Sequence, residues 1–247
     1  LPEHVAHAAF VRSPHAHARV RGLSIEKARA MPGVLAVLTG KDWTDSGLGE
    51  AESNWPVKDM HGEESLTVNR PFLAIDGIVR YVGECVAMVV AEDRYTALDA
   101  AEAVEVDYEA LPANTVTAKA LDADTPLVHE SIGTNLVLET THGDEAAVDA
   151  AFAGAAHITE CAVPTNRVTA APMEPRAYLG QYDPVEDRYT LWSSTQAPHL
   201  ERRYLTMSLK VPEHKCRVIA PDVGGGFGMK LYHFPEQPTV LWAAKIL

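Results

Sequence analysis

The sequence has few cysteines and no long apolar run. Only three cysteines occur among its 247 residues, Cys85, Cys161 and Cys216. They lie far apart and form no CxxC pair, the spacing typical of zinc and iron–sulfur ligands, so we expect reduced, buried thiols. No stretch reaches the roughly 18 consecutive apolar residues that a membrane-spanning helix requires. The composition therefore predicts neither a disulfide framework nor a membrane span.

Positive charge is also scarce. The chain has 21 Lys and Arg against 34 Asp and Glu, which gives a net charge of -13. A surface this negative repels phosphate backbones, which argues against nucleic acid as a partner. No basic segment followed by an apolar stretch opens the chain, so we expect no export signal and a cytoplasmic location. With 47% hydrophobic residues, a chain of this length can bury about 70% of its surface in a core of its own.

The first half of the chain alternates apolar runs with helical patterns. Residues 5–20 read as two extended segments, and Ser24 and Asp93 are candidate N-caps of helices. Residues 41–70 have poor periodicity and predict an irregular excursion. His15 and His17 could contribute to a metal site, but a solvated strand face is favoured because no third ligand stands nearby. Further strands are expected at residues 34–38, 72–75, 78–81, 86–90 and 104–108.

Residues 113–135 are rich in Ala, Thr, Asp and Pro, and we interpret them as a linker between domains at 1–112 and 136–247. Beyond the linker, Asp144 is expected to cap one helix and Pro198 to start another. Strands are expected at 156–163, 177–182, 188–193 and 218–220, and a last helix at 239–247. This helix has no stop signal and the chain begins without Met, so we expect the sequence to be part of a longer subunit.

Four glycines lie within five residues in the segment Pro221–Lys230, directly after a predicted strand. Glycines permit positive φ angles and a close approach of backbone N–H groups to a ligand. The segment fails both common nucleotide fingerprints: Met229 replaces the third glycine of GxGxxG, and Leu231 stands where a P-loop has Ser or Thr. Local features therefore leave a ligand-binding loop and a tight turn equally open.

Two further segments carry polar side chains at strand ends. Gln196 lies between a predicted strand and the helix expected from Pro198, where side chains often meet ligands. Its neutral amide could hold an oxo group or a polar substrate, although a simple helix-entry role is the commoner one. Glu174 and Arg176 lie in a stretch of otherwise apolar residues. They could form a structural ion pair or take part in a functional site, and the sequence leaves both possibilities open.

Together these segments resemble the N-terminal part of the molybdenum-binding large subunit of the xanthine dehydrogenase, aldehyde oxidase and aerobic carbon monoxide dehydrogenase family. The resemblance spans nearly the whole chain, and the order and spacing of modest motifs make it specific. The motifs are Phe10–Ala18, Pro32–Val34, Arg80–Glu84, Val89–Glu92, Val106–Pro112, Met173–Arg176, Ser194–Gln196 and Gly224–Lys230.

The resemblance implies an α+β fold, with an α/β hammerhead domain at 1–112 and the first part of a molybdopterin-binding domain at 136–247. It implies hydroxylation of an aldehyde, an N-heterocycle or carbon monoxide with water-derived oxygen. The cofactor would be molybdenum-molybdopterin, in bacterial relatives the cytosine dinucleotide form. The partners would be the remaining portion of the molybdenum subunit, an FAD subunit and an iron–sulfur subunit carrying 2Fe–2S clusters.

In this family a glutamine hydrogen-bonds an oxygen ligand of the metal, and the resemblance implies that Gln196 is the matching residue in this sequence. Gly225, Gly226, Phe227 and Gly228 match the loop that packs against the pterin, and Phe227 would also wall the pocket. Glu174 receives only a structural role, and the resemblance assigns no protein side chain as a metal ligand.

The sequence departs from the family at two positions. Leu231 stands where purine-hydroxylating relatives have a glutamate, which disfavours xanthine as a substrate, and Cys85 replaces a common proline. The family's catalytic glutamate and most pterin contacts would lie beyond Leu247, so we expect this chain alone to be inactive. A non-catalytic scaffold of the same fold remains the alternative, and the failed fingerprints disfavour an independent nucleotide-binding protein.

Overall fold

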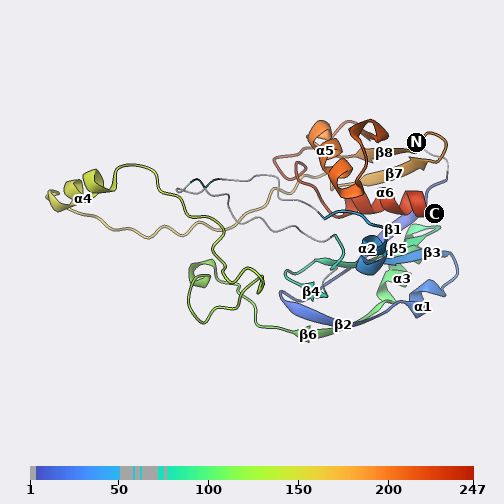
Figure 1. The fold of residues 1–247 in the computed structure, drawn as a ribbon, viewed down its shortest axis with the longest axis horizontal. Coiled ribbons are helices and arrows are strands. Elements are labelled where there is room, and N and C mark those ends of the chain that lie inside the picture. The colour runs from blue at the N-terminus through green and yellow to red at the C-terminus, as the bar shows by residue number, and fades with distance from the viewer. Residues whose placement is uncertain (1–3, 51–57, 59–61, 63–71, 75–76) are drawn as a thin grey trace.

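A computed structural model describes residues 4–50, 58, 62, 72–74 and 77–247. Figure 1 shows two packed halves, one built from the elements between residues 7 and 110 and one from those between residues 178 and 246, with an arm extending from them. Helices and strands are mixed in both halves, which confirms the α+β prediction. Within the described residues, no helix has the length and apolar character needed to cross a membrane.

One antiparallel sheet has the order β1-β5-β3, with bounds His7–Arg12 for β1, Cys85–Ala91 for β5 and Val34–Thr39 for β3. Every residue of the central strand β5 is buried, because its two faces contribute to different cores. Val89 packs with Ala28 and Ala100, whereas Met88 and Val90 face the C-terminal half. The apolar runs at 34–38 and 86–90 therefore form strands as predicted.

The second sheet is also antiparallel and has the order β4-β2-β6, with bounds Ile78–Val79, Ala18–Ser24 and Glu105–Ala110. Asp93 caps α3 (Arg94–Glu102) by accepting the N–H groups of Tyr95 and Thr96, as predicted. Ser24 does not cap α1 (Glu26–Arg29). Ile25 occupies the N-cap position, and the Ser24 hydroxyl donates to the Glu26 carboxylate instead.

The C-terminal half contains the sheet β7-β8-β9, with bounds Tyr178–Asp183, Arg188–Ser193 and Cys216–Ile219. Strands β7 and β8 are antiparallel, whereas β8 and β9 are parallel and are joined through α5 (Pro198–Leu209) and a short 3-10 helix at Glu213–Lys215. The last helix, α6 (Glu236–Ile246), packs on β7. It begins three residues earlier than residue 239, the predicted start.

One helix lies largely within residues 41–70, which were predicted to be irregular, and it packs against both halves. Helix α2 (Gly40–Asp45) starts with a capping box between Thr39 and Asp42, which the weak periodicity did not reveal. Its fully buried Trp43 meets the edge of Trp242 from α6, with ring centroids 5.3 Å apart. One apolar core therefore contains side chains from both halves. The rest of the predicted excursion falls largely outside the described residues.

Two predicted strands are wrong. Residues 156–163 form no strand, because a strand needs hydrogen-bonding partners and none is present among the described residues. Residues 72 and 73 form bends, residue 74 has no regular structure and Ile75 lies outside the described residues, while β4 ends at Val79 rather than at residue 81. The apolar side chains of Phe72 and Leu73 are nevertheless fully buried, so the run belongs to the core without pairing in a sheet.

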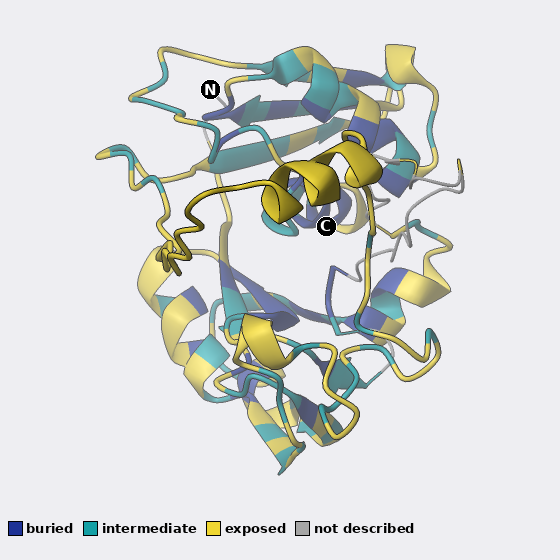
Figure 2. Cartoon of the chain, turned by 90° about the vertical axis from the view of Figure 1, so that its left-hand side faces the viewer, coloured by how far each residue is buried: buried dark blue, intermediate teal, exposed yellow. Residues whose placement is uncertain are grey.

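Residues 139–169, here called the arm, are exposed at every position. The arm includes α4 (Glu145–Ala153), which Asp144 caps as predicted, and Figure 2 shows α4 coloured as exposed throughout. The segment before the arm contains a 3-10 helix at Thr117–Lys119 and is held by the Asn135 amide, which donates to the carbonyls of Ala120 and Pro126.

The three cysteines are free thiols, as expected, but not all are buried. Cys85 and Cys216 are buried, and burial raises the pKa of each thiol to about 12. Cys161 lies in the arm and is exposed, which corrects the expectation of three buried thiols.

Candidate functional site

The loop between β8 and α5 places Gln196 against the glycine-rich segment. The side-chain oxygen of Gln196 accepts the backbone N–H groups of Gly228 and Lys230 at 3.0 and 3.3 Å. The Gln196 N–H donates in turn to the Lys230 carbonyl at 3.2 Å. Because both side-chain contacts come from donors, the accepting atom is the amide oxygen. The amide NH₂ group remains a donor without a partner among the described residues.

The glycines allow this close approach. A Cβ atom at position 226 would lie 2.5 Å from the Gln196 side-chain oxygen, so a larger residue there would displace the amide. Gly225 has a φ of +92°, in the region that favours glycine, and a Cβ there would meet the Phe227 ring at 2.6 Å. The small size of the glycines therefore lets the Gln196 amide lie directly against the backbone of the loop.

The loop retains two adjacent backbone donors. Gly224 N–H donates to Glu174, Gly225 N–H to the Val223 carbonyl, and Met229 N–H to the Gly226 carbonyl. The N–H groups of Gly226 and Phe227 have no hydrogen-bond partner in the part of the chain that the structure describes. Consecutive free N–H groups in a loop with alternating backbone hand form an anion-binding concavity. With the Gln196 NH₂, they suit an electron-rich oxygen atom.

Lys230 anchors the end of the loop. Its side chain is 1% exposed, and its ammonium group lies 2.5 Å from the Glu174 carboxylate. Hydrogen bonding from Lys230, and next from the Gly224 N–H, holds the pKa of Glu174 below its usual range. Glu174 therefore pairs with Lys230 and not with Arg176, whose guanidinium instead lies 3.7 Å from the centre of the Phe234 ring.

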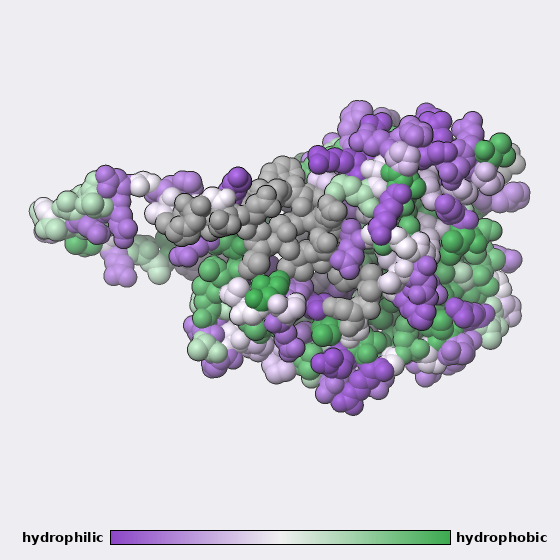
Figure 3. Space-filling model, viewed as in Figure 1, coloured by the Kyte–Doolittle hydropathy of each residue, from purple (hydrophilic) through white to green (hydrophobic). Residues whose placement is uncertain are grey.

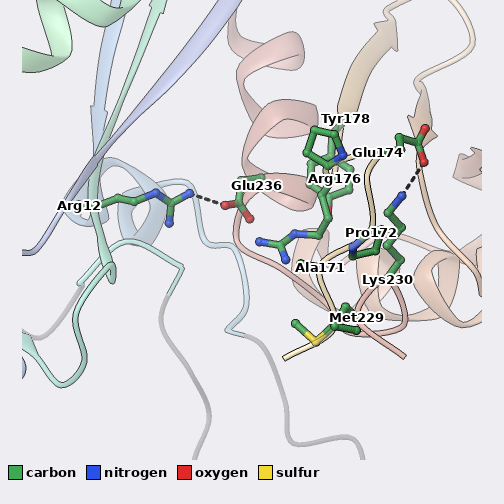
Figure 4. A pocket seen from close by; sticks show the side chains of 11 residues that line it. Arg12, Ala171, Pro172, Glu174, Arg176, Tyr178, Met229, Lys230 and Glu236 are labelled. Atoms are coloured by element: carbon green, nitrogen blue, oxygen red, sulfur yellow. Dashed lines mark hydrogen bonds and ion pairs between the residues drawn. The ribbon is translucent and has the colours of Figure 1, made fainter. Parts of the chain in front are cut away.

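A cavity of about 480 Å³ lies beside this loop, between the two halves of the chain. Figure 4 shows two ion pairs on its lining, Arg12 with Glu236 and Lys230 with Glu174. Arg12 comes from the end of β1 and also donates to the Gly83 carbonyl. The cavity includes Met229 and Lys230 but none of Gln196, Gly225, Gly226, Phe227 and Gly228.

The structure brings most of the predicted site residues together. Gln196 contacts the loop through Gly228 and lies against Gly226, whereas the Phe227 side chain is 77% exposed with a φ of +50°. The sequence prediction did not include Lys230 as an anchor or Glu174 as its partner. The only available signal was that both residues stand in the motifs quoted above.

His15 and His17 do not share a strand face. Both precede β2, where the His15 ring lies 4.9 Å from the Tyr108 ring and His17 Nδ1 lies 2.8 Å from the Pro112 carbonyl oxygen. Among the described residues, no three His, Cys, Asp or Glu side chains gather to form a metal-binding group.

Comparisons with known proteins place both halves in one family. A family model described as the a/b hammerhead domain of aldehyde oxidase and xanthine dehydrogenase matches residues 1–112. A second, described as the molybdopterin cofactor-binding domain, matches residues 128–247.

Relatives of known activity support the same placement. The chain is 38% identical over 234 residues to the carbon monoxide dehydrogenase large chain of Afipia carboxidovorans, covering 90% of this chain and 27% of that one. It is 40% identical over 243 residues to the nicotine 6-hydroxylase large subunit of Paenarthrobacter nicotinovorans, covering 98% and 28%. The crystal structure of quinoline 2-oxidoreductase from Pseudomonas putida 86 matches with a TM-score of 0.89 and 34% identity, over 100% of this chain and 30% of that one.

The chain thus spans about 30% of the length of these relatives. Both family models, the sequence relatives and the solved structure agree on the same kind of subunit. The chain belongs to the family of molybdenum-binding large subunits that includes xanthine dehydrogenase, aldehyde oxidase and carbon monoxide dehydrogenase.

Proposed function

We propose that this chain supplies part of the molybdopterin site of a molybdenum hydroxylase, with Gln196 and the loop Gly225–Gly228 as contacts to the cofactor. The observation that carries the proposal is the set of three donors, the Gln196 NH₂ and the N–H groups of Gly226 and Phe227, held beside a loop that has little side-chain bulk. Molybdopterin fits this arrangement because its metal oxygens are electron-rich and need donors rather than cationic ligands. When bound, the cofactor supplies the redox chemistry of the hydroxylation.

The roles of the residues follow from their contacts. Gln196 Oε1 fixes the loop by accepting two of its N–H groups, and this orients the amide NH₂ as a donor. The ion pair between the buried Lys230 and the partly exposed Glu174 holds both ends of the loop, because Glu174 also accepts the Gly224 N–H. Donors fixed before a ligand arrives need no reorganisation, which is the condition for stabilising charge effectively.

We propose further that the arm (residues 139–169) packs against the remaining portion of the molybdenum subunit. The arm exposes large apolar side chains, including Phe152 at 57%, Ile158 at 63% and Val163 at 78%. Figure 3 shows apolar and polar residues mixed at its outer end. Several large apolar side chains exposed on one segment suit an interaction surface, and this chain covers only about 30% of its relatives.

The substrate, in this proposal, is an N-heterocycle, an aldehyde or carbon monoxide. The relatives named above act on carbon monoxide, nicotine and quinoline, and Leu231 keeps xanthine disfavoured. We propose further that the cofactor is the cytosine dinucleotide form and that partner subunits carry FAD and 2Fe–2S clusters. We also propose that residues 113–135 are a linker between the two domains.

The test uses the complete subunit assembly with the variant Gln196→Ala and, as a matched control, Gln181→Ala at an exposed position of β7. Molybdenum content, the nucleotide released from the cofactor, and dye-coupled turnover of a heterocycle, an aldehyde and carbon monoxide are measured. We expect Gln196→Ala to lower turnover about 100-fold or more, as for the loss of one preorganised donor, while Gln181→Ala behaves like the wild type.

Unchanged turnover and molybdenum content in Gln196→Ala would refute the proposed role of this residue. A folded wild-type assembly that contains no molybdenum would favour the non-catalytic scaffold instead.

A further inference from the structure

The cavity beside the loop has a surplus positive charge. Its charged lining residues are three cations and two carboxylates: Arg12, Arg176, Lys230, Glu174 and Glu236. Arg12 pairs with Glu236, and Lys230 pairs with Glu174. Arg176 is the remaining cation, and it forms no ion pair with the residues that the structure describes. A fixed cation in a cavity attracts anions, even on a chain whose net charge is -13.

Arg176 is held in place before a ligand arrives. It lies between Pro175 and β7, and its guanidinium carbon is 3.7 Å from the centre of the Phe234 ring. The Phe234 N–H donates to Gln237 Oε1 at 2.8 Å, which fixes the chain that carries the ring. The ring contact restrains the guanidinium without neutralising its charge. A restrained side chain loses less conformational freedom when it binds a ligand, which favours affinity.

The Arg176 guanidinium is accessible from the cavity. Figure 4 shows it between the two ion pairs of the lining. Because Arg176 is exposed, a small molecule can reach it from solvent. Tyr178 also lines the cavity, and burial raises its pKa far above neutrality. The Tyr178 hydroxyl therefore stays protonated and does not offset the charge of Arg176.

The rest of the lining is apolar. It consists of Ala170, Ala171, Pro172, Pro175 and Met229. The cavity volume of about 480 Å³ is within the range of small-molecule sites. An inorganic anion would contact the cation alone, whereas an organic acid would also remove its apolar body from water against these side chains. The lining therefore suits a small organic acid better than it suits phosphate.

We propose that this cavity binds the carboxylate group of a small organic acid and that Arg176 is the residue that recognises it. A planar guanidinium matches a carboxylate through two parallel N–H···O bonds. The apolar body of the acid then lies against the alanine, proline and methionine side chains of the lining. The inference concerns binding, and it does not rest on the proposed function.

The test measures the affinity of the complete subunit assembly for benzoate by ligand-detected NMR. Benzamide has the same ring without the charge, and inorganic phosphate has the charge without the ring. We expect benzoate to bind the wild type at least about tenfold more tightly than benzamide, as for one charge-assisted pair, and more tightly than phosphate. A wild type that binds no benzoate, or that prefers phosphate, would overturn the proposal. An acidic side chain of the assembly that already occupies Arg176 would give the first of these results.

Variants of Arg176 locate the bound acid. Arg176→Gln removes the charge, and Arg176→Lys keeps the charge without the planar fork. We expect the affinity for benzoate to fall at least about tenfold in Arg176→Gln and severalfold in Arg176→Lys. Arg94→Gln, at an exposed position of α3, is the matched control and should bind benzoate like the wild type.

Both Arg176 variants should fold, because the side chain is exposed and forms no ion pair among the described residues. Unchanged affinity in Arg176→Gln would place benzoate elsewhere and overturn the proposal. Unchanged affinity in Arg176→Lys would show attraction by charge alone and would overturn the recognition of the carboxylate by the guanidinium.

Glu236→Gln tests the charge balance of the lining from the opposite direction. It releases Arg12 from its ion pair and leaves the cavity with a second unpaired cation. We expect benzoate to bind severalfold more tightly to this variant than to the wild type. Equal or weaker binding would contradict the assignment of the surplus charge as the source of affinity.

The binding result is separable from the proposed function. If Gln196→Ala retains full turnover while Arg176→Gln loses benzoate, the assignment of the cofactor site fails and the carboxylate site stands. If Gln196→Ala loses turnover while Arg176→Gln binds benzoate like the wild type, the proposed function stands and the carboxylate site fails.

Discussion

Strand β5 and the arm (residues 139–169) both contain apolar residues, yet one is buried and the other is exposed at every position. Strand β5 pairs with β1 and β3 and contributes to two cores, so each of its faces has a neighbour. The arm has neither a pairing strand nor a covering helix among the described residues. The difference lies in the available partners, because burial requires a second surface. If the arm packs as proposed above, the second surface that its exposed apolar side chains need is the remaining portion of the molybdenum subunit.

The largest effect is expected in the core that joins the two halves. Trp242→Ala removes a side chain that is 3% exposed, packs against Trp43 and donates to Ser46 Oγ at 3.2 Å. We expect a loss of about 3 to 5 kcal/mol in unfolding free energy, measured by urea denaturation. The unfolding curve should keep a single transition that shifts to lower urea concentration. Separate unfolding of one half would show that the shared core does not couple the two halves.

The next largest effect concerns Glu201, whose folded-state pKa of about 7 lies above its ordinary value of 4.5. Between these values the unfolded chain releases a proton that the folded chain retains, so wild-type stability falls as the pH rises through this window and is constant above it. Glu201→Gln removes this loss, which amounts to on the order of 3 kcal/mol. Urea denaturation at several pH values measures the free energy of unfolding of both proteins. An equal dependence of this free energy on pH in the wild type and in Glu201→Gln would contradict the prediction.

A smaller effect is expected for Gly226→Ala. Its Cβ would lie 2.5 Å from Gln196 Oε1, so the amide must turn away and give up its bonds to Gly228 and Lys230. We expect a loss of roughly 1 to 2 kcal/mol in stability and a sharp decrease in bound molybdenum, measured by metal analysis of the assembly. Gly22→Ala is the control, because a Cβ there is 3.8 Å from its nearest neighbour. Equal molybdenum content in Gly226→Ala and Gly22→Ala would contradict this prediction.

The smallest effect is expected in the arm. Phe152 in α4 is 57% exposed, so Phe152→Ala should change the stability of this chain by less than about 0.5 kcal/mol. In the complete assembly the same change should cost considerably more, if the arm packs as proposed. Urea denaturation of both forms gives the comparison, and a neutral effect in both would remove the proposed packing surface.

Local signals predicted much of this fold. Asp93 and Asp144 cap helices where expected, because capping depends on a few neighbouring atoms. The uniformly apolar β5 was recognisable because a strand covered on both faces has no polar side. The segment at 156–163 shows the limit of such reasoning, since its pattern suits a strand and the pairing partner is absent from the described residues.

The candidate site was predictable only in part. The glycine loop and Gln196 were identified through their motifs, but local features left a ligand loop and a tight turn equally open. That Glu174 would pair with Lys230, 56 residues away, was not visible in the sequence. The same holds for Glu201, which sits in an ordinary helical pattern and becomes unusual only because the fold buries it beside Ser193.

By itself, the sequence determined the negative charge, the apolar runs, the helix caps and the order of motifs that identifies the family. These depend on residue type and on neighbours within a few positions. The tertiary structure alone decided that Trp43 would join two halves in one core, that the Gln196 oxygen would accept two loop N–H groups, and that Glu201 would be buried. These are contacts between distant segments, and their energies depend on distances and solvent exclusion that only the folded chain defines.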